Sequence, residues 1–107
     1  YPREMAFAAT LMLDNAEHVI GVARYVTCED GRTCEFAIVI ADAWQGRGIG
    51  RRMIAKLILV ARDAGLRAIY GDVLAMNRPM LDLMRNMGFR LARHPDDATI
   101  VRGTLEL

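Results

Sequence analysis

The stretch AWQGRGIGRRM, residues 43–53, decides how the rest of the chain can fold. Its glycines and arginines follow one another closely, as Gly46, Arg47, Gly48, Gly50, Arg51 and Arg52. The apolar run FAIVIA precedes it, and apolar residues at helical spacing follow it. Glycine lets backbone N–H groups approach an anion, and the first N–H groups of a helix have no partners within the helix. The stretch therefore predicts a phosphate-binding turn between a strand and a helix.

The segments on either side of this turn complete a strand–helix–strand unit. The helical pattern runs from Ile49 to Ala61, and Gly65 is a natural helix stop. AIYGDVL, residues 68–74, is predicted as the next strand, so the connection is a right-handed parallel crossover. CEFAIVIA is almost continuously apolar, which is typical of a strand covered on both faces.

An antiparallel meander is predicted before the turn. REMAFAATLML ends at the turn signal Asp14–Asn15, and HVIGVARYVT follows as a strand rich in Val, Ile and Tyr. Asp30–Gly31 is a strong hairpin turn that leads into CEFAIVIA.

A second helix and two final strands are predicted after the crossover. NRPMLDLMRNMGF begins a helix at Pro79 and ends it at Gly88. Its apolar stripe is interpreted as core rather than as cofactor contact: Met80, Leu83, Met84 and Met87. Residues 89–92 and 99–107 are the last strands, joined by a turn at 94–97. The expected fold is a mixed α/β, mostly antiparallel sheet with one parallel crossover.

Composition indicates one small domain over the 107 residues. Apolar residues make up 53% and charged residues 25%, and the net charge of +1 provides no field that would attract nucleic acid. No apolar segment is long enough to span a membrane and no signal peptide is visible, so we expect a cytoplasmic protein without a membrane partner. Cys28 and Cys34 are interpreted as free thiols, and no Cys/His cluster has the spacing of a metal site.

Residue spacing alone separates the known phosphate motifs only in part. A P-loop requires a Lys and a hydroxyl residue at its end, and both are missing here. A dinucleotide-binding turn requires G-x-G-x-x-G, whereas this chain has G-x-G-x-G after an antiparallel meander. A glycine-rich connection with solvated arginines remains open as an alternative.

The segment from Gln45 to Gly50 fits the signature Q/R-x-x-G-x-G/A of the GNAT superfamily of N-acetyltransferases, which the order of elements also resembles. This resemblance implies acetyl-CoA as co-substrate and no metal. The loop would bind the pyrophosphate, the strand before it would bind the pantetheine arm, and Asn77 would hydrogen-bond that arm. The implied contacts are Ile38, Val39, Ile40, Gln45, Gly46, Arg47, Gly48, Ile49, Gly50, Arg51 and Asn77.

YPREMAF and CEFAIVIADAWQGRGIG resemble more closely the acetyltransferase domain of bacterial protein lysine acetyltransferases. In that group the domain often follows an acyl-CoA-synthetase-like region, to which this chain could be fused or against which it could pack. Pro2 departs from the acidic residue expected there. The resemblance implies that residues 1–107 are one acetyl-CoA-binding domain from the C-terminal part of a longer chain. The family's first strand and first two helices would then be missing.

The activity implied is transfer of an acetyl group to a primary amine, with a protein lysine as acceptor. Glu35, three residues before Ile38, occupies the position of the group's general base; Glu4 is a second carboxylate that we interpret as solvent-facing. Met84 replaces the Tyr that often protonates the leaving thiolate, and Met80 replaces a small residue. Tyr70 is a weak substitute donor, better interpreted as a core aromatic. Small-amine acetylation and a non-catalytic acetyl-CoA-sensing module are the alternatives.

Overall fold

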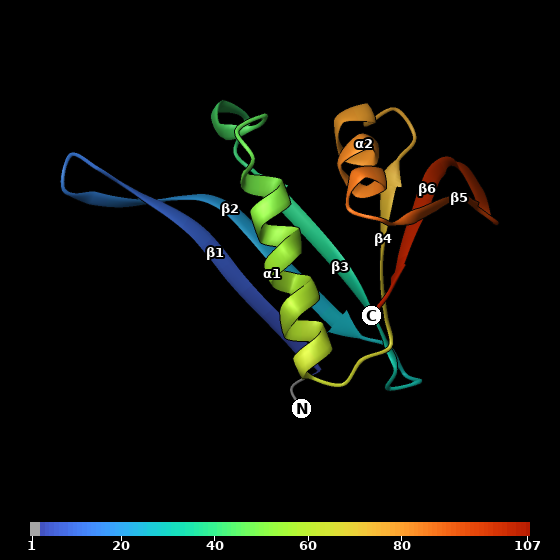
Figure 1. Cartoon of the computed structure of the whole chain (residues 1–107). Helices are drawn as coiled ribbons and strands as arrows, with labels where there is room; N and C mark the ends of the chain where they lie inside the picture. The colour runs from blue at the N-terminus through green and yellow to red at the C-terminus, as the bar shows by residue number, and fades with distance from the viewer. Residues whose placement is uncertain (1–2) are drawn as a thin grey trace.

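The computed structural model describes residues 3–107, so Tyr1 and Pro2 of the YPREMAF motif lie outside the described residues. The described part contains six strands, two α-helices and one turn of 3-10 helix (Figure 1). In chain order they are β1 (Glu4–Leu13), β2 (Ala16–Thr27), β3 (Thr33–Ile40), the 3-10 turn η1 (Asp42–Trp44), α1 (Ile49–Asp63), β4 (Ala68–Leu74), α2 (Arg78–Asn86), β5 (Arg90–His94) and β6 (Asp97–Glu106).

The strands form one sheet in the order β1-β2-β3-β4-β6-β5. β3 and β4 are parallel and the other neighbouring pairs are antiparallel, which confirms the predicted mixed sheet and its crossover through α1. α1 ends just before Gly65, whose φ of 81° is the left-handed conformation expected of a helix stop. The last turn is shorter than predicted, because His94 already pairs with Asp97 across the hairpin.

The core lies between one face of the sheet and the two helices. α1 packs against β2 and β3, and α2 packs against β5 and β6, with both helices in front of the sheet in Figure 1. The largest side chains that are almost completely buried are Tyr25, Ile54, Leu57, Ile69 and Met84. No α-helix within residues 3–107 has the length and apolar character needed to cross a membrane.

The expectation that β3 is covered on both faces is wrong. Cys34 and Phe36 are buried, whereas Glu35 and Ala37 are exposed and Val39 is 69% exposed. Both helices pack on the same face of the sheet, so alternate β3 side chains point to an uncovered face. We call this uncovered side of the sheet the open face. The sequence of β3 did not predict the open face, because Ala37 and Val39 are apolar although they are exposed.

β3 and β4 separate soon after they meet. They pair at only three positions among the described residues, Thr33 with Ala68, Cys34 with Ile69 and Glu35 with Tyr70. β3 continues to Ile40 and stays paired with β2, while β4 continues to Leu74 and stays paired with β6. The β4-facing backbone edge of β3 therefore has no strand partner after Glu35, and Figure 1 shows the two strands diverging from this vertex.

Candidate functional site

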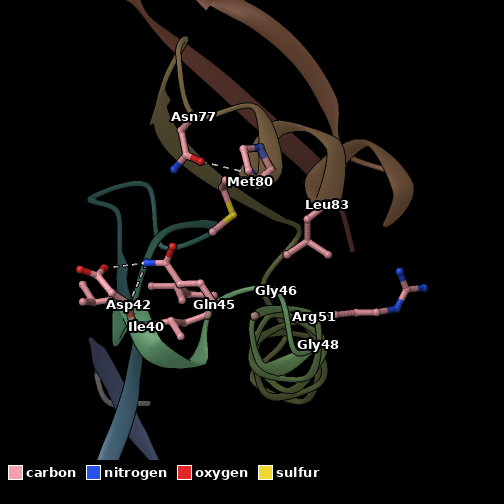
Figure 2. Close-up of a pocket in the computed structure, with 13 residues that line it drawn as sticks. Ile40, Asp42, Gln45, Gly46, Gly48, Arg51, Asn77, Met80 and Leu83 are labelled. Carbon is pink, nitrogen blue, oxygen red and sulfur yellow. Dashed lines mark hydrogen bonds between the residues drawn. The ribbon is translucent and has the colours of Figure 1, made fainter.

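A cavity of about 530 Å³ lies beside the unpaired edge of β3. The end of β3, the glycine loop with the first turn of α1, and the start of α2 form its walls (Figure 2). Its lining residues are Ile38, Val39, Ile40, Asp42, Gln45, Gly46, Gly48, Gly50, Arg51, Asn77, Pro79, Met80 and Leu83. This volume is in the range of small-molecule sites in proteins.

The glycine loop leaves the N-terminus of α1 open to an anion. Gly48 is the N-cap residue with φ of 81°, and Gly46 has φ of 76°, so both adopt a conformation that other residues rarely take. No side chain caps α1, and its first turn contains no acidic residue. The first backbone N–H groups of α1 are therefore available, with the positive end of the helix dipole behind them.

The side chain of Gln45 holds the start of the glycine loop in place. Its Nε2 group donates hydrogen bonds to the carbonyl oxygen of Ile40 and to Oδ1 of Asp42, both at 3.2 Å. Figure 2 shows these bonds at the edge of the cavity opposite Arg51, whose side chain extends away from them. Gln45 thus ties the loop back to the end of β3.

The start of α2 forms the remaining wall. Asn77 caps this helix, because its Oδ1 accepts a hydrogen bond from the backbone N–H of Met80 at 3.3 Å. Gly50 allows α1 to lie close to this wall and to β3. A Cβ atom at Gly50 would lie 3.1 Å from Cδ1 of Ile40 and 3.3 Å from Cδ2 of Leu83.

Most of the contact residues predicted from the sequence line this cavity: Ile38, Val39, Ile40, Gln45, Gly46, Gly48, Gly50, Arg51 and Asn77. Arg47 and Ile49 instead line a second cavity, between α1 and β1. Met80 and Leu83, interpreted as core, pack against the core and also line the first cavity. The spacing of a helical apolar stripe cannot predict which of its residues also line a cavity, because core residues and cavity residues have the same spacing.

Glu35 lies at the vertex where β3 and β4 separate, outside the residues that line the cavity. Its side chain is exposed on the open face, opposite Tyr70 of β4 and Val26 of β2 in the sheet register. Glu4 lies on the same face beyond Val26 and forms an exposed ion pair with Arg24 at 3.5 Å. Glu35 is therefore the carboxylate at the closed end of the space between the two strands.

The interpretation of Tyr70 as a core aromatic is wrong, because its side chain is half-buried on the open face. The Cys28 thiol donates a weak hydrogen bond to its hydroxyl, with Sγ 3.8 Å from the oxygen. Burial, the neighbouring Cys28 and the charge of Glu35 raise the pKa of Tyr70 to about 12. The hydroxyl thus stays protonated at neutral pH, and its contact is with Cys28 rather than with the cavity. Cys28 and Cys34 are both free thiols, as predicted.

An ion pair beside Tyr70 joins β4 to β6. Arg102 donates to Asp72 through Nε at 2.8 Å and through Nη2 at 3.0 Å, and its guanidinium lies 4.5 Å from the centre of the Tyr70 ring. The hydrogen bonds from Arg102, with the positive charges of Arg102 and His94, hold the pKa of Asp72 below its usual value. His94 Nε2 lies 4.0 Å from Oδ2 of Asp72.

We expect Asp72→Asn to destabilise the protein by about 1–3 kcal/mol at pH 7, because a hydrogen-bonded charge is lost. Since the folded-state pKa of Asp72 is lowered, its stabilising effect is complete above the unfolded-state value of about 3.9. It disappears as the pH falls through the lowered folded-state pKa. Urea unfolding should therefore show that the difference in free energy of unfolding between wild type and Asp72→Asn becomes smaller below about pH 4. Asp82→Asn, which removes an exposed pair with Arg85, should have little effect at either pH.

The family model described as Acetyltransferase (GNAT) family matches residues 1–89. Acetyltransferase PA5475 of Pseudomonas aeruginosa is 40% identical over 107 residues, which are all of this chain and 58% of that protein.

Two solved structures are also similar. The GNAT domain of PAT from S. lividans has a TM-score of 0.83 and 25% identity, covering 98% of this chain and 61% of that one. The structure of yncA from Salmonella typhimurium with its cofactor acetyl-CoA has a TM-score of 0.75 and 24% identity, covering 84% and 59%. The chain thus spans about three-fifths of the length of these relatives.

Proposed function

The chain belongs to the acetyltransferase (GNAT) family, and on this premise we propose that it transfers an acetyl group from acetyl-CoA to a primary amine. The observation that carries the proposal is the unpaired edge of β3. This edge runs from the glycine loop to Glu35 and lies beside the cavity along its last three residues, 38–40. One end thus offers a site for an anion and the other offers a carboxylate.

The residues of the cavity fit acetyl-CoA, which supplies an acetyl group activated as a thioester. The loop glycines and the first N–H groups of α1 would hold the pyrophosphate, and Arg51 would add positive charge. The free backbone groups of β3 are available to the amides of the pantetheine arm, with Ile38 and Ile40 as apolar contacts. The side-chain N–H groups of Asn77 remain available as donors, since its oxygen caps α2.

Glu35 is proposed as the general base. A lysine amine has a pKa of about 10.4 and is protonated at neutral pH, so it must lose a proton before it attacks. Glu35 is exposed at the vertex and can accept that proton directly or through a water molecule. The amine nitrogen then attacks the acetyl carbon and the carbon–sulfur bond breaks, so that coenzyme A leaves as a thiolate and takes up the second proton that the nitrogen loses. A free backbone N–H of β3 would stabilise the negative charge on the acetyl oxygen.

A protein lysine is the proposed acceptor. The open face around Glu35 is uncovered in residues 3–107, so a side chain presented by another protein could approach it. The resemblance of YPREMAF and CEFAIVIADAWQGRGIG to the acetyltransferase domain of bacterial protein lysine acetyltransferases supports this choice over a small amine. Two free thiols are typical of a reducing compartment, and we propose the cytoplasm as the location. A region like acyl-CoA synthetases is the proposed neighbour in the whole protein.

Acceptor panels with radiolabelled acetyl-CoA test this function. We expect label to appear on lysine side chains of a protein panel faster than on free lysine, other amino acids or small amines. Faster labelling of the small molecules would establish the small-amine alternative. Binding of acetyl-CoA without labelling of any acceptor would mean that the chain is a sensing module and that the enzymatic proposal is wrong.

A further inference from the structure

A second cavity, of about 480 Å³, lies between β1 and the first half of α1. It shares no lining residue with the first cavity. Apolar side chains from β1, β2 and α1 contribute to its lining, among them Phe7, Leu11, Ile20 and Met53. Its size and apolar lining resemble those of the first cavity, but it has no role in the reaction proposed above.

Three cations line this cavity, Arg47 from the glycine loop and Arg52 and Lys56 from α1. No acidic residue lines it, and none of the three forms an ion pair with another residue in the described part of the chain. Arg52 and Lys56 are four positions apart on α1, where like charges repel each other. The one acidic residue of α1 is Asp63, at its far end. An anion in the cavity would remove this repulsion.

Aromatic rings hold two of these cations beside the cavity. The Arg47 guanidinium lies 4.9 Å from the centre of the Trp44 ring, and the Lys56 ammonium lies 4.8 Å from the centre of the Phe7 ring. Both rings also line the cavity. Cation–π contacts of this kind restrict long flexible side chains, so the positive charges stay next to the apolar surface.

We propose that this second cavity binds an organic anion with an apolar body. A carboxylate would lie between Arg52 and Lys56, within reach of Arg47, and an aliphatic chain would lie on the apolar lining. The cavity combines positive charge with apolar surface. We therefore expect it to select ligands that carry both a negative charge and an apolar chain. This site is independent of acetyl transfer.

Octanoate is a suitable probe, with octylammonium and acetate as matched controls for charge and for the apolar chain. Trp44 is the single tryptophan of the chain and lines the cavity, so its fluorescence reports directly on occupancy. We expect octanoate to change Trp44 emission in a saturable way, and the two controls to have no effect at the same concentrations. Equal binding of octylammonium would show a merely apolar surface and overturn the proposal.

The double variant Arg52→Gln/Lys56→Gln should raise the Kd for octanoate about tenfold, since each exposed charge contributes modestly. Arg62→Gln, also on α1 but outside both cavities, should leave the Kd unchanged. Circular dichroism checks that both variants keep their helix content. An unchanged Kd in the double variant contradicts the proposal. Displacement of octanoate by saturating acetyl-CoA would also contradict it, because the two cavities would then serve one ligand.

Discussion

Glu35→Gln is expected to lower the rate of amine acetylation about 10²- to 10⁴-fold, the usual contribution of a general base. Glutamine has the same shape as glutamate but cannot accept a proton from the ammonium group of the acceptor, which must become a neutral amine before it attacks. Acetyl-CoA affinity should stay within about twofold of wild type, because Glu35 lies outside the cavity that the donor is proposed to occupy. Single-turnover acetylation and calorimetric titration with acetyl-CoA measure the two effects separately.

Glu4→Gln is the matched control. Glu4 lies on the same face of the sheet in the same cross-strand row, two strands away from Glu35, or roughly 10 Å. Its carboxylate forms an exposed pair with Arg24, so its loss should change neither rate nor affinity measurably. Equal losses of rate in the two variants would show a general effect of surface charge, and the base would have to be sought elsewhere.

Gly48→Val is expected to raise the Kd for acetyl-CoA about 10- to 100-fold. The backbone of Gly48 has φ of 81°, a conformation that costs a branched residue about 1–3 kcal/mol. The loop can relieve this strain only by changing its conformation, which withdraws the N–H groups from the proposed pyrophosphate site. Each tenfold change in Kd corresponds to about 1.4 kcal/mol, so the strain and the expected loss of affinity agree in size.

Gly65→Val separates loss of the site from loss of stability. Gly65 also has φ of 81°, and a side chain at either glycine would meet open space. The same strain is therefore introduced at the far end of α1, away from the cavity. We expect similar losses of unfolding free energy in the two variants, with acetyl-CoA affinity lost only in Gly48→Val. Wild-type affinity in Gly48→Val would remove the loop from the proposed donor site.

Local signals in the sequence predicted the elements well. AIYGDVL is β4 at the residues expected, Gly65 is the stop of α1, and Pro79 lies in the first turn of α2. Each of these depends on a few neighbouring residues. The glycine turn with Gly46, Gly48 and Gly50 was predicted for the same reason, because the backbone conformation at a helix N-terminus is a local property.

Features that depend on contacts between distant segments could not be predicted. The exposure of Val39 depends on which face of the sheet both helices cover. The direction of Arg47 depends on the position of Trp44 and of β1, a strand about 40 residues earlier in the chain. The environment of the Tyr70 hydroxyl depends on Cys28, which follows β2 and contacts Tyr70 from the other side of β3. No periodicity within a short window contains this information.

The three register pairs that join β3 to β4 have a mechanical consequence. They are the only ladder between the two halves of the sheet in residues 3–107, and they lie at one end of it. A backbone hydrogen bond from the N–H of Arg67 to the carbonyl oxygen of Arg32, at 2.6 Å, reinforces the same end. The strands of the two halves are thus joined by a ladder at one end only, although their side chains share one core. If the two halves rotate relative to each other about this end, Ile40 is displaced farther from β4 than Glu35, because Ile40 lies five residues beyond the last paired position.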